Sequence, residues 1–193
     1  MDRHALRRDL RERRRNLPAA VRIAAADRLA DRLQSLPFAP HEGHVAGYWS
    51  MDGEIGVHAW QLRLQQSLTY CLPVLHDDGR LRFAAWRSGE PLVTNRYGIP
   101  EPDVADAELL DPALMAMVVV PVVGFDAGCR RLGMGAGWYD RSFACRQSTA
   151  APPWLVGAAF AVQQIDALNV EDWDVTLDAV CSEDATYRAK AHR

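Results

Sequence analysis

The residues best suited to chemistry lie in one segment, residues 130–142, which reads RRLGMGAGWYDRS. Its glycines, at every second position, allow positive φ angles and let the backbone approach a ligand closely. Arg131 presents a planar guanidinium that matches phosphate oxygens. Asp140 offers a carboxylate, the kind of ligand that Mg²⁺ takes beside phosphate groups. These residue types indicate an anion site for a phosphorylated ligand.

The spacing of the glycines matches neither of two common phosphate-binding motifs. No Gly-Lys-Ser/Thr follows them as in a P-loop, and Gly133, Gly135 and Gly137 alternate too tightly for the dinucleotide fingerprint. A turn that only lets a helix pack on a sheet is therefore a competing interpretation, and the glycines alone favour it. Arg131 and Asp140, which flank the loop, favour the anion site instead.

A strand and a helix must hold this loop in place. Residues 118–123 form a β-branched apolar run without alternation, which is typical of a strand covered on both faces. Residues 138–143 read as the first turns of a helix, so the predicted order is strand, glycine loop, helix. The other predicted helices cover residues 1–16, 18–35 and 57–67, and the other predicted strands cover residues 44–49, 68–75, 81–86 and 154–160.

These elements predict a single α/β domain over residues 1–193, with a mainly parallel open sheet and helices on both faces. The DDG sequence at residues 77–79 is a strong turn signal, so an antiparallel hairpin is expected at one edge of the sheet. Residues 91–102 contain too much Pro and Gly for regular structure. The basic tail, residues 188–193, is expected to fray.

Size and composition are those of an ordinary globular protein. The chain of 193 residues is 49% apolar and 24% charged, which suits one well-buried domain. No stretch approaches the roughly 18 apolar residues of a membrane span, and no secretory signal is visible, so we expect a cytoplasmic protein without membrane association. The four scattered cysteines suggest neither a disulfide framework nor a zinc site. The arginines beside Cys129 favour a lowered thiol pKa.

The charge is unevenly distributed along the chain. Residues 1–15 contain seven arginines and three acidic residues, a net charge of +4, which leaves −7 for the rest. Arg3, Arg7, Arg11 and Arg14 recur at helical spacing. Three interpretations compete: a solvated basic face, a nucleic-acid patch, and arginines that fold back to hold a polyphosphate.

The pattern in residues 121–141 is more specific than its glycines. PVVGFD followed by RLGxGxGWYDR resembles the signature of the 5-formyltetrahydrofolate cyclo-ligase family, also called methenyltetrahydrofolate synthetases. NRYGIPEP at residues 95–102 resembles a second landmark of that family, and the likeness extends from Arg3 to Glu183. The resemblance implies a Rossmann-like sheet and a ligase that converts 5-formyltetrahydrofolate to 5,10-methenyltetrahydrofolate with ATP and Mg²⁺, releasing ADP and phosphate.

The resemblance also implies roles for individual residues. Arg131 and Asp140 are implied in catalysis, and Asp140 and Asp174 in binding Mg²⁺. The residues implied in binding ATP are Arg3, Arg7, Arg131, Leu132, Gly133, Met134, Gly135, Ala136, Gly137, Trp138 and Tyr139. Those implied in binding the folate are Trp49, Glu54, Tyr97, Met134 and Trp138. Cys129, Met134 and Ala136 depart from the residues usual in the family.

The implied mechanism transfers the γ-phosphoryl group of ATP to the formyl oxygen, after which N10 attacks the activated carbon. Such a transfer needs mainly positioning and charge neutralisation, which arginines, glycine N–H groups and carboxylates supply. The expected partners are small molecules and not nucleic acid, and we expect a monomer, with a dimer as the alternative. Two rival hypotheses are a folate-binding relative without phosphoryl transfer and a nucleic-acid module built on the Arg-rich helix.

Overall fold

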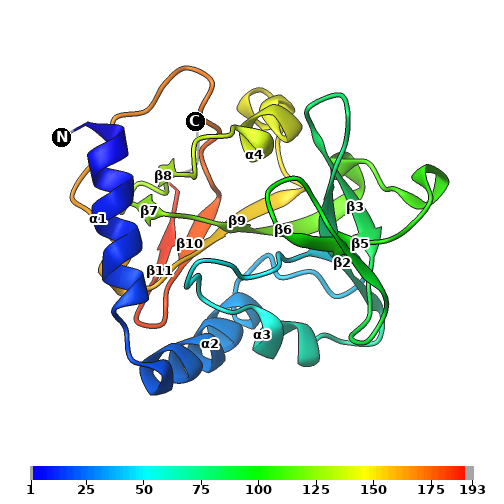
Figure 1. The fold of residues 1–193 in the computed structure, drawn as a ribbon, viewed down its shortest axis with the longest axis horizontal. Helices are drawn as coiled ribbons and strands as arrows, with labels where there is room; N and C mark the ends of the chain where they lie inside the picture. The colour runs from blue at the N-terminus through cyan, green and yellow to red at the C-terminus, as the bar shows by residue number, and fades with distance from the viewer. Residues whose placement is uncertain (1, 190–193) are drawn as a thin grey trace.

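A seven-stranded sheet runs through the protein, which the computed structural model describes for residues 2–189 (Figure 1). The strand order is β11-β10-β9-β6-β1-β2-β3. The bounds along this order are Thr186–Arg188, Ala179–Cys181, Trp154–Ala158, Met115–Pro121, Gly43–Ala46, Leu68–Leu75 and Leu81–Ala85. The strands from β10 to β2 are parallel to their neighbours, whereas β3 and β11 pair antiparallel at the two edges. The predicted mainly parallel sheet with an edge hairpin is confirmed.

Helices cover both faces of this sheet, as predicted. The α-helices are α1 (Arg3–Arg15), α2 (Ala19–Gln34), α3 (His58–Leu62) and α4 (Trp138–Ser142), and the 3₁₀ helices are η1 (Asp106–Glu108), η2 (Pro112–Leu114), η3 (Ala144–Gln147) and η4 (Ala161–Gln163). Helices α2 and α3 lie below the sheet in Figure 1, α4 lies above it, and α1 stands at one end. None of the helices in residues 2–189 is both long and apolar enough to cross a membrane.

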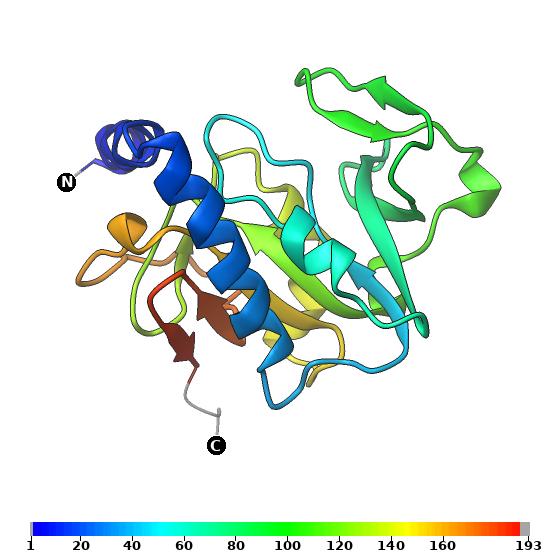
Figure 2. The same cartoon turned by 90° about the horizontal axis from the view of Figure 1, so that it is seen from below.

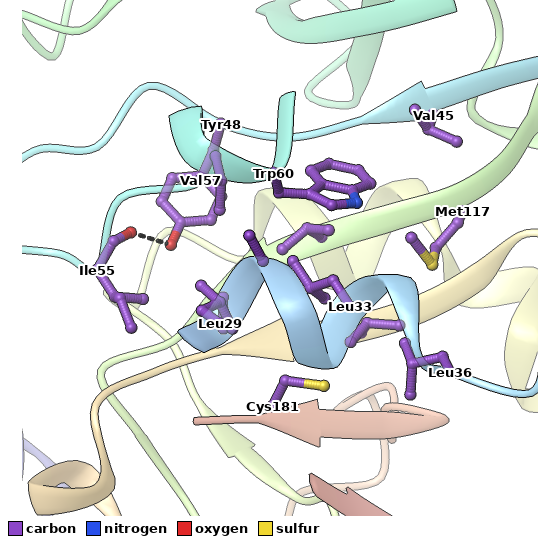
Figure 3. Packing of buried hydrophobic residues seen from close by; sticks show 14 of the residues in the cluster. Leu29, Leu33, Leu36, Val45, Tyr48, Ile55, Val57, Trp60, Met117 and Cys181 are labelled. Carbon is purple, nitrogen blue, oxygen red and sulfur yellow. Dashed lines mark hydrogen bonds between the residues drawn. The ribbon is translucent and has the colours of Figure 1, made fainter. Parts of the chain in front are cut away.

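The side chains of α2 and α3 fill the core on one face of the sheet (Figure 3). Leu29 and Leu33 are one turn apart on α2 and fully buried, and Trp60 of α3 packs in the same cluster. Burying each of these large side chains stabilises the fold by about 2–3 kcal/mol. The Tyr48 hydroxyl donates a hydrogen bond of 2.7 Å to the Ile55 carbonyl, which closes the loop after β1 against this core.

The central strand β6 is apolar on both sides because both sides are covered. Met117 and Val119 belong to the cluster under α2, while Val118 and Val120 belong to a second cluster with Phe143. This explains the unbroken apolar run in the sequence, since a strand exposed on one face would alternate. The glycine loop therefore lies downstream of a strand that is packed on both faces.

Several element boundaries differ from the prediction. Helix α3 is shorter than the predicted residues 57–67. Strand β11 was not predicted, and it includes Arg188, the first residue of the tail that was expected to fray. Residues 190–193 of that tail lie outside the described part of the chain. Residues 131 and 132, predicted as loop, pair as β8 (Arg131–Leu132) with β7 (Gly124–Phe125).

Residues 91–102 form regular structure where none was predicted. Strands β4 (Leu92–Thr94) and β5 (Pro100–Pro102) make a separate antiparallel hairpin that stands away from the main sheet (Figure 2). The Asn95 side chain accepts hydrogen bonds from the backbone N–H groups of Tyr97 and Ile99, and so organises the turn. The prolines are tolerated because β5 lies at an edge, where a missing N–H donor is not costly.

Strands β1 and β6 are neighbours in the sheet, but the strands that follow each of them are added on opposite sides: β2 and β3 beyond β1, and β9 and β10 beyond β6. The crossover from β1 to β2 runs through α3 on one face, whereas that from β6 to β9 runs through α4 on the other. In open α/β sheets such a reversal leaves a crevice outside the carboxyl ends of the two strands, where ligands bind. The loop after β1 and the glycine loop after β6 both belong to this edge.

Gly47, directly after β1, should not tolerate a side chain. A Cβ atom there would lie 2.2 Å from the Tyr70 hydroxyl oxygen, and the buried Tyr70 ring has little room to move. We expect Gly47→Ala to lower the free energy of unfolding by about 1–3 kcal/mol through overpacking. Chemical denaturation measures this. Gly56→Ala is the matched control, because its Cβ would meet only the Ala26 methyl at 3.9 Å; equal stability of the two variants would contradict the prediction.

Candidate active site

A cavity of about 490 Å³ lies at the crevice between β1 and β6. Its walls include Trp49 from the loop after β1, Leu75 at the end of β2, and Pro121 at the end of β6. Helix α1, the glycine loop and the segment at Asp174 complete the lining. Segments that are far apart in sequence thus meet at the carboxyl edge of the sheet.

The residues assigned from the sequence converge on this cavity. Those that line it are Arg3, Arg7, Trp49, Glu54, Tyr97, Arg131, Gly133, Met134, Gly135, Ala136, Gly137, Trp138, Tyr139, Asp140 and Asp174. Their individual roles stay predictions. A larger hollow of about 900 Å³, between α3, β2 and the segment after β5, contains none of them.

Leu132 is the exception. Its side chain is fully buried in a cluster with Leu10 and Leu168, and its carbonyl accepts a 2.8 Å hydrogen bond from Val123 N–H. The Leu132 side chain, predicted to bind ATP, therefore does not line the cavity and instead packs α1 against the base of the glycine loop. The sequence interpretation treated it as part of the glycine turn, whereas strand pairing turns it inward.

The glycine loop adopts the backbone that its sequence permits. Gly135 and Gly137 have φ angles of 104° and 69°, and Gly137 immediately precedes α4. Arg7 of α1 lies against this loop, since its Nε donates a 2.8 Å hydrogen bond to the Gly133 carbonyl. Burial first, and the neighbouring charge of Arg3 second, lower the pKa of Arg7. A cation is thus held beside backbone N–H groups, an arrangement suited to phosphate.

Arg131 joins three parts of the site from a buried position. Its guanidinium donates to the carboxylate of Asp140 on α4 and to the carbonyl of Val175, and only 7% of the residue is exposed. The same Asp140 oxygen accepts a 3.1 Å hydrogen bond from Val175 N–H. The two residues expected to act in catalysis therefore form an ion pair, which fixes the glycine loop, α4 and the 175 segment together.

Asp174 is held by the amino-terminal helix. Its Oδ2 accepts hydrogen bonds of 3.0 Å from Arg3 Nη2 and from Glu171 N–H. Arg3 also lies 3.6 Å from the Glu171 carboxylate. The expected metal ligand Asp174 and the expected ATP ligand Arg3 thus form an ion pair.

The carboxylates fit a magnesium ion that arrives with a nucleotide. Within residues 2–189 no group of three or more acidic, His or Cys side chains is placed to hold a metal alone. Asp140 and Asp174 nevertheless line one cavity and are close, because Val175, next to Asp174, bonds Asp140. Mg²⁺ is commonly held by one or two carboxylates together with phosphate oxygens and water, which matches this donor set.

Aromatic residues form the opposite wall. The Trp138 indole N–H donates a 3.4 Å hydrogen bond to the Tyr97 hydroxyl, and the two rings meet edge to face. The guanidinium groups of Arg96 and Arg141 each lie 5.2 Å from the Trp138 ring centre. The turn between β4 and β5 is thereby attached to α4 across the mouth of the cavity.

Glu54 lines the cavity beside Trp49. Its Oε2 accepts a 3.0 Å hydrogen bond from Met51 N–H, and its Oε1 lies 3.7 Å from Arg14 Nη2. Burial raises the pKa of Glu54, while the Met51 N–H and the charges of Arg14 and Arg11 oppose that rise. A carboxylate in this setting can accept hydrogen bonds from the N–H groups of a heterocycle.

Cys129 does not behave as the neighbouring arginines suggested. It is fully buried, and burial raises its thiol pKa to about 11. Arg130 turns instead to Asp126, whose carboxylate it meets at 2.6 Å, and Arg131 turns to Asp140. The predicted lowering of the Cys129 pKa is therefore wrong, because the charges beside it in sequence point elsewhere in space.

Two groups near the site were not singled out from the sequence. Asp52 accepts hydrogen bonds from Arg11, Arg14 and Arg15 at the carboxyl end of α1. Asn95 lines the cavity and organises the turn that carries Tyr97. The regular spacing of the arginines indicated that they share one face of a helix. It could not indicate Asp52 as their shared partner, because Asp52 lies in a loop 37 or more residues away.

The fold and the cavity define an α/β enzyme of the doubly wound type with its ligand site at the switch point. The model of the 5-formyltetrahydrofolate cyclo-ligase family matches residues 1–183. A relative from Haemophilus influenzae, 5-formyltetrahydrofolate cyclo-ligase, is 33% identical over 91% of this chain and 94% of its own length. The protein of the same name from Escherichia coli K12 is 34% identical over 89% and 94%.

Solved structures agree with these sequence matches. The NMR structure of Aquifex aeolicus 5,10-methenyltetrahydrofolate synthetase superposes with a TM-score of 0.83 at 26% identity, covering 100% of this chain and 95% of that one. The Mycoplasma pneumoniae synthetase, at 20% identity and a TM-score of 0.72, shares the fold. The chain belongs to the 5-formyltetrahydrofolate cyclo-ligase family, and it is an enzyme.

Gly135→Ala should impair the glycine loop. An L-residue is disfavoured at a φ of 104°, at a cost of about 1–3 kcal/mol, so we expect ATP to bind at least about fivefold more weakly. Calorimetric titration with a non-hydrolysable ATP analogue measures the change. Gly89→Ala is the matched control, with a φ of 96° and no atom within 4 Å of its Cβ, remote from the cavity. Unchanged affinity in Gly135→Ala would contradict the assignment.

Proposed function

We propose that this protein converts 5-formyltetrahydrofolate to 5,10-methenyltetrahydrofolate with ATP in the cavity at the end of β1 and β6. The observation that carries the proposal is the meeting, in one cavity, of a cationic glycine loop with a wall of Trp49, Glu54 and Tyr97. The first set suits a polyphosphate and the second suits a flat heterocycle bearing N–H donors.

The reaction requires that an amide oxygen become a leaving group. In the proposed sequence the γ-phosphoryl group of ATP moves to the formyl oxygen as its bond to ADP breaks. The N10 lone pair then attacks the formyl carbon, N10 loses its proton, and the carbon–oxygen bond breaks as phosphate departs. Phosphoryl transfer depends mainly on positioning and on neutralising charge, so no protein nucleophile is needed.

The phosphate side of the cavity supplies that neutralisation. Arg7 and the N–H groups of residues 133–137 would bind the triphosphate, while Arg131 holds Asp140 and contributes its own charge from behind the loop. Arg3 would turn from Asp174 to the phosphates when nucleotide enters. Asp140 and Asp174 would hold Mg²⁺, which would supply neutralisation of charge on the phosphate oxygens.

The folate side of the cavity would orient the pterin ring. Glu54, when ionised, would accept hydrogen bonds from pterin N–H groups, and Trp49 would provide a flat apolar surface beside them. Tyr97 and Trp138 lie nearer the mouth, joined by their hydrogen bond. This arrangement would keep the formyl group between the pterin wall and the glycine loop.

Two further expectations accompany the proposal. The substrates are small molecules, and we propose that the enzyme works in the cytoplasm as a monomer, with a dimer as the alternative. The contacts of the Arg-rich helix favour small-molecule substrates over nucleic acid as the ligand. Four of its arginines bond other parts of the same chain: Arg3, Arg7, Arg11 and Arg14.

Arg7→Ala tests the nucleotide side. Loss of a charge-assisted contact to phosphate costs about 1.5–3 kcal/mol, so we expect the KM for ATP to rise at least about tenfold with the fold unchanged. Methenyltetrahydrofolate absorbance in a mixture with 5-formyltetrahydrofolate, ATP and Mg²⁺ provides the assay. Arg8→Ala, an exposed arginine of the same helix that does not line the cavity, is the control. A wild-type KM in Arg7→Ala would remove Arg7 from the site.

Arg131→Ala is expected to lose activity and stability together. It would leave the Asp140 carboxylate and the Val175 carbonyl without their buried partner. Breaking a fully buried pair costs about 3–5 kcal/mol, and the cost should be lower here because the Asp140 side chain is 21% exposed. Thermal unfolding and the absorbance assay separate the effects when Arg131→Lys, which retains the charge, is measured alongside. An active and equally stable Arg131→Ala would contradict both roles.

A further inference from the structure

Arg14, at the carboxyl end of α1, is fully buried although it carries a charge. A buried guanidinium is costly unless it is paired and hydrogen-bonded. Its neighbours Arg13 and Arg15 are about half exposed, with side-chain exposures of 47% and 52%. The helix therefore turns one particular arginine inward, and the partners of that arginine indicate what it does.

Within residues 2–189, the guanidinium of Arg14 contacts polar groups of one short loop after β1. Its Nε donates a 3.0 Å hydrogen bond to the Asp52 carbonyl, and its Nη2 donates one of 2.9 Å to the Asp52 carboxylate. The same Nη2 lies 3.7 Å from the Glu54 carboxylate. Arg14 thus binds both the backbone and the side chain of Asp52, which lies two residues before Glu54.

This loop has a backbone that needs external support. Asp52 and Gly53 have φ angles of 53° and 74°, so two successive residues are left-handed. For Asp52 this conformation is disfavoured. The loop is closed internally by Glu54 N–H to the Met51 carbonyl at 2.9 Å and by Tyr48 to Ile55. The remaining contacts that fix Asp52 come from the arginines of α1.

The pairing of Arg14 is incomplete. Its Nη1 is buried and has no hydrogen-bond partner within residues 2–189. An unsatisfied buried donor costs about 1–3 kcal/mol, so a selection for stability alone would favour another side chain. Departures of this kind concentrate at functional sites.

We infer that Arg14 is a positioning residue for the cyclo-ligase reaction, which holds the Asp52–Glu54 loop so that the ionised Glu54 faces the pterin. The inference rests on the proposed function. Arg14 does not line the cavity and acts through Glu54. Helix α1 would thereby support both sides of the cavity: Arg7 contacts the glycine loop, and Arg14 contacts the loop that carries Glu54.

The charge of Arg14 also bears on the ionisation of Glu54. Burial raises the pKa of Glu54, and Met51 N–H, Arg14 and Arg11 oppose the rise. The hydroxyls of Tyr48 and Tyr139 also lie near it, and burial raises the pKa of both, so they stay neutral. The Asp52 carboxylate shares Arg14 Nη2 with Glu54. Glu54 binds as the anion, so activity falls as pH drops through its pKa. Removing the Arg14 charge raises the pKa of Glu54 further. The acidic limb of the pH profile of activity therefore moves to higher pH.

The test compares Arg14→Gln and Arg14→Lys with Arg13→Gln in the enzyme. Arg13 is a half-exposed arginine of the same helix whose ion pair is with Asp9 and not with the Asp52 loop. In Arg14→Gln we expect the KM for 5-formyltetrahydrofolate to rise at least about tenfold, the KM for ATP to stay within about twofold, and the acidic limb of the kcat/KM pH profile to shift to higher pH. Arg14→Lys should restore the limb, and Arg13→Gln should match the wild type.

A purely structural Arg14 would give another result: a lower melting temperature with both KM values and the pH profile unchanged. That result overturns the inference. Should Arg14→Gln fail to fold, Asp52→Asn serves instead, because Asn tolerates the left-handed region; it should raise the folate KM and leave the ATP KM unchanged. Wild-type values for both substrates in Asp52→Asn would overturn the inference equally. Inactivity of the wild type in the absorbance assay would instead contradict the proposed function.

Discussion

The structure depends on the docking of α1 across the carboxyl edge of the sheet through arginines on one face of the helix. Arg3 meets Asp174, Arg7 meets the Gly133 carbonyl, and Arg11 and Arg14 meet Asp52. These partners lie in three separate loops, each of which contributes to the cavity wall. A single helix with a repeat of three to four residues thus ties together loops that the sheet alone would leave independent.

This arrangement explains how the site can be prepared before ligands bind. Positive charge is concentrated by α1 and partly desolvated, which strengthens its action on phosphate compared with charge in water. The acidic groups are paired as well: Arg3 of α1 pairs with Asp174, and Arg131 pairs with Asp140. The buried β6 strand supplies the rigid base, because both of its faces are packed.

The sequence predicted those features whose cause is local or repeated. The apolar run of β6, the glycines with positive φ and the turn at residues 77–79 follow from residue type, and the family pattern placed the site residues. Features that depend on partners distant in sequence could not be predicted. Leu132 turns inward because β8 pairs with β7. The arginines beside Cys129 do not lower its pKa, because Arg130 pairs with Asp126 and Arg131 pairs with Asp140. Arg14 can be buried because it pairs with Asp52.

The most direct test of this description is a crystal structure with a non-hydrolysable ATP analogue, Mg²⁺ and 5-formyltetrahydrofolate. The triphosphate should lie against the N–H groups of residues 133–137 with Arg7 beside it. Asp140 and Asp174 should share the metal, and Glu54 should contact the pterin. A nucleotide bound elsewhere, with the glycine loop empty and Arg7 still on the Gly133 carbonyl, would contradict it.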